Sequence, residues 1–230
     1  MHLFLTNDIS VTTVRINGDE HHHLSRVVRL RVDDTVYVTD GGGNAVEAVI
    51  EEIGHGETRC RVTASHENFN EPRVPVTLLQ GVLKNPGKMD WLVEKGTELG
   101  MTEFVPLLTE RTIARSVKID RLQKLAETAT KQCLRGRIPK IQSPISLAEA
   151  VQAQAGARLL LFHEDAPLDA TPEALVRDGR PLALFIGPEG GFSNEEVELL
   201  RSLGADILSL GPRRLRGETA GLAALARING

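Results

Sequence analysis

The chain has 230 residues, 41% hydrophobic and 25% charged, which is long enough to bury a substantial core without disulfides. The formal net charge is −4, and the two cysteines, Cys60 and Cys133, lack the spacing of a disulfide framework or a zinc site. No apolar run approaches a membrane span and no signal-peptide pattern opens the chain, so we expect a cytoplasmic protein that binds neither membrane nor metal.

The charge is unevenly distributed along the chain. Residues 1–72 contain 6 Lys or Arg and 12 Asp or Glu, whereas residues 73–230 contain 21 and 19. Residues 111–140 alone hold nine basic and two acidic residues. Because salt screens each charge beyond roughly 8–10 Å, this local surplus is compatible with binding nucleic-acid phosphates even on an acidic protein. A solvated helix face is the alternative.

Residues 1–72 are predicted to form a small β-rich domain. A helix is expected over residues 21–30, where Leu24, Val27 and Val28 share a face. Short strands separated by turn-forming residues favour a compact barrel. The segments with concentrated or alternating β-branched residues are 11–16, 35–39, 45–50 and 58–63.

Three consecutive histidines, His21 to His23, open this helix. Consecutive helical residues point in different directions, and no second His or Cys cluster is spaced to help them, so we favour a helix-start or surface role over a metal site. Arg26, Arg29 and Arg31 are the best candidates for nucleic-acid contact in this domain. Solvated ion pairs are the alternative.

Residues 67–75, polar and with two prolines, are the most plausible linker to a second domain over 73–230. Strands and helices alternate there, which is typical of a mostly parallel α/β sheet. Asn85 as N-cap, Pro86 at N1 and Gly100 beyond the end bracket one helix. The other expected elements are strands over 76–83, 103–107, 159–162 and 182–186 and helices over 120–134 and 147–155.

The glycine-rich loop 187–191 follows the apolar strand 182–186, and Ser193 with Glu196 forms a capping box that starts the next helix. Glycines at the carboxyl end of a buried strand let backbone approach a ligand closely. The loop lacks the phosphate-binding motifs and carries Glu189, which favours a neutral or cationic ligand. A plain Gly-Pro turn is the alternative.

His163 and Glu164 follow the strand 159–162. In a parallel sheet they would lie at the same edge as the loop 187–191, which makes them candidate site residues. They are alternatively ordinary polar residues of a loop.

Four segments resemble the RsmE family of ribosomal RNA methyltransferases in the SPOUT superfamily: residues 22–30, 88–100, 186–192 and 210–220. The resemblance implies an α/β fold, in which a PUA-like β-barrel over 1–72 precedes a SPOUT domain over 73–230 with a C-terminal trefoil knot. It also implies a homodimer that uses S-adenosyl-L-methionine to methylate N3 of a uridine in 16S ribosomal RNA, free or in the assembled small subunit. The alternatives are another RNA target and a non-catalytic RNA-binding ribosome-assembly protein.

On this resemblance, three loops hold the methyl donor, and Arg216 stabilises the uracil anion that forms when N3 loses its proton. Glu218 takes that proton or orients Arg216. The predicted cofactor contacts are Leu161, His163, Glu164, Gly187, Glu189, Gly190, Gly191, Leu210, Gly211, Leu215, Thr219 and Ala220. The predicted RNA contacts are Arg26, Arg29, Arg31, Arg115, Lys118, Lys131 and Arg135.

Overall fold

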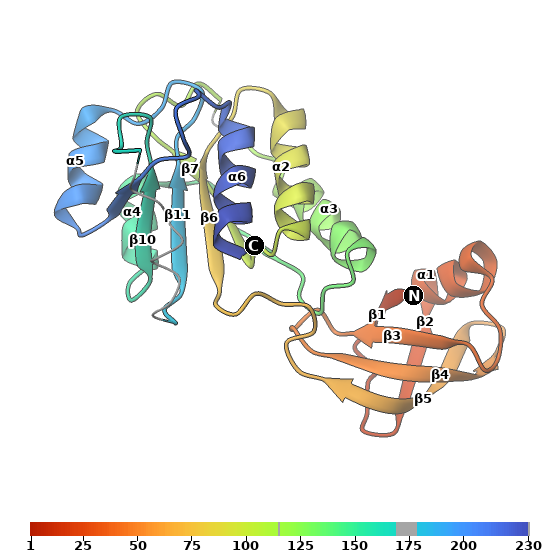
Figure 1. Ribbon diagram of the computed structural model, residues 1–230. Coiled ribbons are helices and arrows are strands. Elements are labelled where there is room, and N and C mark those ends of the chain that lie inside the picture. The colour runs from red at the N-terminus through yellow and green to blue at the C-terminus, as the bar shows by residue number, and fades with distance from the viewer. Residues whose placement is uncertain (115, 169–178, 230) are drawn as a thin grey trace. The chain divides into compact units, whose positions relative to one another are not determined.

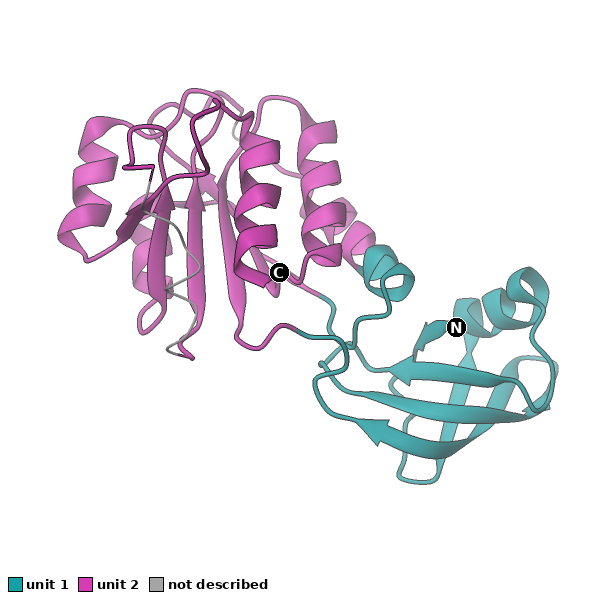
Figure 2. Ribbon diagram, viewed as in Figure 1, with its two compact units in different colours: residues 1–71, 127–138 teal, residues 72–126, 139–230 magenta. Residues whose placement is uncertain are grey.

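The computed structural model describes residues 1–114, 116–168 and 179–229, and the chain divides into two compact units (Figures 1 and 2). Unit 1 comprises Met1–Glu71 and Glu127–Ile138, and unit 2 comprises Pro72–Ala126 and Pro139–Gly230. The sequence prediction places the whole of residues 73–230 in the second domain. The structure differs, because residues 127–138 group with the N-terminal unit.

Unit 1 is built on one five-stranded sheet whose hydrogen-bonded order is β1-β3-β4-β5-β2. The strands β1 and β3 are parallel, and the other three neighbouring pairs are antiparallel. Alternating residues of these strands bury one face, which includes Val14, Ile16, Val36 and Val38. The strands are β1 (Leu3–Leu5), β2 (Thr13–Asn17), β3 (Thr35–Thr39), β4 (Ala45–Ile53) and β5 (Glu57–His66).

The helix expected over residues 21–30 is present as two joined pieces, α1 (Gly18–His22) and a π-helix, η1 (His23–Val28). Leu24 is fully buried, but Val27 is 61% exposed, so the prediction of a shared face was wrong for Val27. The wider turn of a π-helix rotates each successive side chain by less than an α-helix does. His21 is buried and its Nδ1 lies 2.9 Å from the hydroxyl of Thr58, which is a structural contact.

The segment 127–138 begins in the C-terminal half of α3 (Ile119–Gln132) and then runs alongside the unit 1 sheet. The hydroxyl of Thr39 donates a hydrogen bond of 2.7 Å to the carbonyl of Gly136. The backbone N–H of Gly136 in turn donates to the carbonyl of Phe69 at 2.8 Å. These bonds explain why a segment so distant in sequence completes unit 1.

A buried ion pair reinforces this attachment. The carboxylate of Glu71 accepts hydrogen bonds from Nε (3.2 Å) and Nη2 (2.6 Å) of Arg135 and from the backbone N–H of Arg137 (2.9 Å). Arg135 is 2% exposed. The prediction that Arg135 contacts RNA is therefore corrected, because its guanidinium is buried inside unit 1 and bound to Glu71.

The sequence predicts a mostly parallel sheet in unit 2, and the strands that the structure describes there are all parallel, in the order β12-β10-β11-β6-β7-β8. A further short strand, β9, also pairs with β7. The apolar run of β11 is buried along its whole length. The strands are β6 (Val76–Gly81), β7 (Glu103–Leu108), β8 (Lys140–Ile141), β9 (Ile145–Ser146), β10 (Arg158–Phe162), β11 (Leu182–Ile186) and β12 (Asp206–Leu208).

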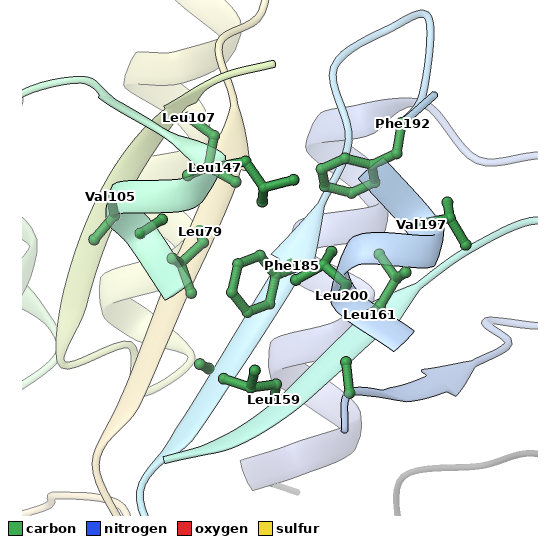
Figure 3. Close-up of a cluster of buried hydrophobic side chains, with 13 residues drawn as sticks. Leu79, Val105, Leu107, Leu147, Leu159, Leu161, Phe185, Phe192, Val197 and Leu200 are labelled. Atoms are coloured by element: carbon green, nitrogen blue, oxygen red, sulfur yellow. The ribbon is translucent and has the colours of Figure 1, made fainter. Parts of the chain in front are cut away.

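Helices cover both faces of this sheet (Figure 1). On one face, α2 (Pro86–Glu98) packs against α6 (Gly217–Asn229), and α6 also contacts β6 and β11. On the other face lie α4 (Leu147–Ala153) and α5 (Asn194–Ser202). Figure 3 shows the cluster of buried hydrophobic side chains between the sheet and these two helices. Phe185 of β11 lies at its centre, close to Leu200 of α5 and with Leu147 of α4 above it.

The helix ends match the local sequence signals. Asn85 caps α2 by accepting a hydrogen bond from the N–H of Gly87, with Pro86 at the first helical position. Ser193 and Glu196 form the predicted capping box of α5. Because all strands of the sheet are parallel, the loops that follow β6, β10, β11 and β12 gather at one edge.

Candidate active site

The loop 187–191 has a conformation that favours glycine at both of its ends. A Cβ on Gly187 would lie 2.9 Å from Cα of Gly191, and Gly191 itself has a φ of 70°. The side-chain amide of Gln80 donates to the carbonyl of Gly187 at 2.9 Å. Gly81 gives Pro188 room, since a Cβ there would lie 2.3 Å from the Pro188 nitrogen. The end of β6 thus holds the loop in place.

Polar contacts tie the loop to its neighbours on both sides. The carboxylate of Glu189 accepts a hydrogen bond of 3.0 Å from the N–H of Lys84, in the segment between β6 and α2. The carbonyl of Gly190 accepts one of 2.9 Å from Nη1 of Arg111, which follows β7. Glu189 therefore helps to build the loop as well as supplying negative charge.

A pocket of about 860 Å³ opens at this edge of the sheet, within the range of small-molecule sites. The loops after β10, β11 and β12 and the beginnings of α2 and α6 form its walls. The lining residues are Lys88, Phe162, His163, Glu164, Asp165, Ala166, Leu168, Ile186, Gly187, Pro188, Glu189, Gly191, Phe192, Leu210, Gly211, Pro212, Arg213, Arg214, Leu215, Arg216, Gly217 and Ala220.

Nine of the twelve predicted cofactor contacts lie in this lining, together with Arg216. The other three, Leu161, Gly190 and Thr219, are not among these lining residues, and their contact with the cofactor stays a prediction. The side chain of Leu161 packs in the core beneath α5, the carbonyl of Gly190 binds Arg111, and Thr219 is exposed on α6 without reaching the pocket.

The acidic lining residues Glu164 and Asp165 follow β10. Nε of Arg214 lies 3.5 Å from the Glu164 carboxylate, but both side chains are mostly exposed, so this pair contributes little stability. The N–H of Asp165 donates to Nδ1 of His163 at 3.3 Å. This wall of the pocket therefore presents carboxylates that suit a positively charged group.

Glu218 does not stand free beside Arg216 but is 7% exposed and paired with Lys88, whose Nζ lies 2.9 Å from its Oε1. Burial raises the pKa of the Glu218 carboxyl, but the hydrogen bond from Lys88, a backbone hydrogen bond and the charges of Lys88 and Arg216 together outweigh it, so the pKa lies below its usual value. The structure thus pairs Glu218 with Lys88, and its predicted role as the base or as the group that orients Arg216 stays a prediction. Lys88 is a pocket residue that the sequence prediction missed. The signal that could have identified it is a lysine in the first turn of a helix, where the helix dipole disfavours a cation.

The remaining predicted RNA contacts differ in their surroundings. Arg26, Arg29, Arg31 and Lys118 are exposed. The ammonium of Lys131 lies 2.5 Å from Oε1 of Glu20 within unit 1. Arg115 lies outside the described residues.

Residues 1–114, 116–168 and 179–229 contain no group of three or more His, Cys, Asp or Glu placed to hold a metal ion. Over the same ranges, no helix is both long and apolar enough to cross a membrane.

Comparison with known proteins finds similarity along nearly the whole chain. Residues 70–229 match the family model of an RNA methyltransferase domain, and residues 16–63 match that of an RNA methyltransferase PUA domain. The ribosomal RNA small subunit methyltransferase E of Synechocystis sp. is 34% identical over 223 residues, which cover 94% of this chain and 73% of that protein.

Two solved structures resemble this one closely. A ribosomal RNA small subunit methyltransferase E from Neisseria gonorrhoeae, bound to S-adenosyl methionine, gives a TM-score of 0.83 at 28% identity. A probable rRNA-methyltransferase from Porphyromonas gingivalis gives 0.83 at 33% identity. Each match covers 98% of this chain and 95% of the other.

Proposed function

Because the chain belongs to the ribosomal RNA small subunit methyltransferase E family, we propose that it is an S-adenosyl-L-methionine-dependent enzyme that methylates N3 of a uridine in 16S ribosomal RNA. The observation that carries this function is the similarity over nearly the full chain to proteins of that name, one of them bound to S-adenosyl methionine. The position of the methyl group on the base rests on the resemblance stated above.

The pocket fits S-adenosyl-L-methionine. The apolar side chains of Ile186, Leu210 and Leu215 line it and can pack on the adenine, while the close approach of Gly187 and Gly191 leaves backbone groups accessible. The carboxylates of Glu164 and Asp165 suit the positively charged sulfonium. When bound, this donor supplies an electrophilic methyl group.

The residues of the chain have the tasks of positioning and charge stabilisation. Uracil deprotonated at N3 carries its negative charge on O2 and O4. Arg216 lines the pocket, is exposed, and presents a guanidinium that can bind either oxygen. Stabilising this anion lowers the barrier without any covalent intermediate on the protein.

The Arg216→Ala variant tests this assignment. We expect methylation to fall by about 100-fold or more, which is the usual loss for one donor to a developing anion. We expect S-adenosyl-L-methionine to bind with nearly the wild-type Kd in calorimetry, because Arg216 faces the base. Unchanged turnover would remove Arg216 from the catalytic residues.

Mass spectrometry of ribosomal RNA nucleosides, from a strain that lacks the protein and from the complemented strain, tests the function as a whole. We expect 3-methyluridine to disappear from 16S ribosomal RNA and to return on complementation. Loss of a tRNA or ribose modification instead would favour another target. If the purified protein does not bind S-adenosyl-L-methionine in calorimetry, the non-catalytic ribosome-assembly role is favoured.

We also propose that the C-terminal segment forms a trefoil knot, that the protein is a homodimer, and that it acts in the cytoplasm. In support of the knot, the chain that follows β12 returns to the middle of the sheet, where a Cβ on Gly217 would lie 2.9 Å from Leu83 and 3.4 Å from the carbonyl of Gly187. Light scattering combined with size-exclusion chromatography tests the dimer. A monomer mass would refute it.

A further inference from the structure

Lys88 lines the pocket, but binding of the cofactor does not account for a lysine at this position. It lies in the first turn of α2, just after β6, and 27% of its side chain is exposed. Its ammonium has three N–H donors, and among the described residues the contact it makes is with Glu218 at 2.9 Å. The remaining donors are available on the pocket side.

Glu218 binds the Lys88 ammonium and is not itself among the pocket lining residues. It is the second residue of α6 and is 7% exposed. Its second carboxylate oxygen, Oε2, is buried without a hydrogen-bond partner in the described structure. A buried carboxylate oxygen without a hydrogen bond lowers the stability of the fold. We therefore attribute the presence of Glu218 to its binding of Lys88, which a hydrophobic side chain could not provide.

The pocket has carboxylates at the end of β10, one of them 3.5 Å from Arg214, and the ammonium of Lys88 at the other side, beyond β6. Glu164 and Asp165 follow β10, whereas Lys88 follows β6, and β11 lies between these two strands. Two strand spacings separate the sites by roughly 10 Å at the sheet edge. The acidic side suits the sulfonium of the donor, and the side with Lys88 suits a group that becomes negative.

We propose that Lys88 is a catalytic residue that donates a hydrogen bond to one of the two carbonyl oxygens flanking N3 of the target uracil, and that Glu218 is its positioning residue. This assignment rests on the proposed function. It gives the uracil anion two cationic donors, Lys88 and Arg216, one for each of O2 and O4.

The step balances as follows. The N3–H bond breaks, its proton passes to water through the pocket mouth, and its electron pair stays on the ring, spread over O2 and O4. N3 then bonds to the methyl carbon while the carbon–sulfur bond of the sulfonium breaks and its electron pair remains on sulfur. Both products are neutral at the reacting atoms, so the attraction of the methylated base to Lys88 and Arg216 weakens and favours its release.

The test compares Lys88→Met with Lys95→Met, a matched control on the same helix whose ammonium contacts Glu94 and Glu98 at the surface. We expect kcat of Lys88→Met to fall on the order of 100-fold, as for loss of one donor to a developing anion. We expect its Kd for S-adenosyl-L-methionine to change by less than about threefold in calorimetry. Lys88→Arg restores a cationic donor and should recover part of the rate.

A second RNA separates a catalytic from a structural role. In 16S ribosomal RNA transcribed with 5-fluorouridine triphosphate, N3 is more acidic, so the anion needs less help from the protein. We expect the deficit of Lys88→Met to shrink on this RNA, and to shrink on ordinary RNA as the pH rises. Glu218→Gln should show a smaller deficit with the same dependence, because it weakens the placement of Lys88 and leaves its ammonium present.

Three results would overturn the assignment. If Lys88→Met matches Lys95→Met while the wild type makes 3-methyluridine, the inference fails and the proposed function stands. A deficit that is equal on both RNAs and at every pH would mark a purely structural role and would also refute it. If the wild type methylates N3 of no uridine or 5-fluorouridine in these RNAs, whether free or assembled into small subunits, the proposed function fails and this inference fails with it.

Discussion

Replacing Glu71 by glutamine tests the contact that attaches residues 127–138 to unit 1. The side chain of Glu71 is 4% exposed and accepts three hydrogen bonds, two from Arg135 and one from the backbone of Arg137. Glutamine removes the charge and replaces one acceptor oxygen with an NH₂ group that faces other donors. Breaking a buried ion pair from one side costs about 3–5 kcal/mol, and we expect about 3 kcal/mol because one acceptor oxygen remains.

Hydrogen exchange followed by mass spectrometry measures this loss separately in each unit. A cost of about 3 kcal/mol corresponds to roughly 100-fold faster exchange of the most protected amides of β3, β4 and β5. Amides of β6, β10 and β11 in unit 2 should exchange at the wild-type rate. Glu67→Gln, an exposed acid in the same stretch, is the control. Exchange in β3–β5 no faster than in this control would refute the reasoning.

Two other substitutions give sharp outcomes. Gly81→Ala places a Cβ 2.3 Å from the Pro188 nitrogen, so the loop 187–191 must move. The affinity for S-adenosyl-L-methionine, measured by calorimetry, should therefore fall at least about tenfold. The control Gly56→Ala, which has open space around the new Cβ, should leave that affinity unchanged. Burial, aided by the charge of Glu51, raises the pKa of the Cys60 thiol from 9.0 to about 11. The folded protein therefore favours the neutral thiol, and the free energy of unfolding from urea titrations should decline as the pH rises from 9 through about 11. A Cys60→Ala variant should lack this component, and an identical decline in that variant would contradict the assignment.

Elements with complete local signals were predictable from the sequence. Asn85 and Pro86 bracket the start of α2, and Ser193 with Glu196 marks the start of α5, because capping depends on residues within one turn of each other. The edge of the sheet at which the pocket lies was also predictable. Buried apolar strands that alternate with helices imply a parallel sheet, and the carboxyl ends of its strands meet at one edge.

Features that depend on distant partners were not predictable. Arg135 has the sequence context of a solvent-exposed cation, and only its contact with Glu71, 64 positions away, makes it a buried one. Lys88 and Glu218 are likewise brought together by the packing of α2 against α6. The pattern around Val27 favoured an ordinary helix, and the π-helix that forms there turned this side chain outward.

The division of unit 1 between two stretches of the chain has a consequence for its synthesis. Nascent chains fold from the N-terminus as they emerge from the ribosome, and domains generally fold as units. Here the N-terminal sheet emerges first, but Arg135 and Gly136 are translated only after residues 72–126. Until then Glu71 has no guanidinium to bind, so the completion of unit 1 must wait until part of the catalytic unit has already been made.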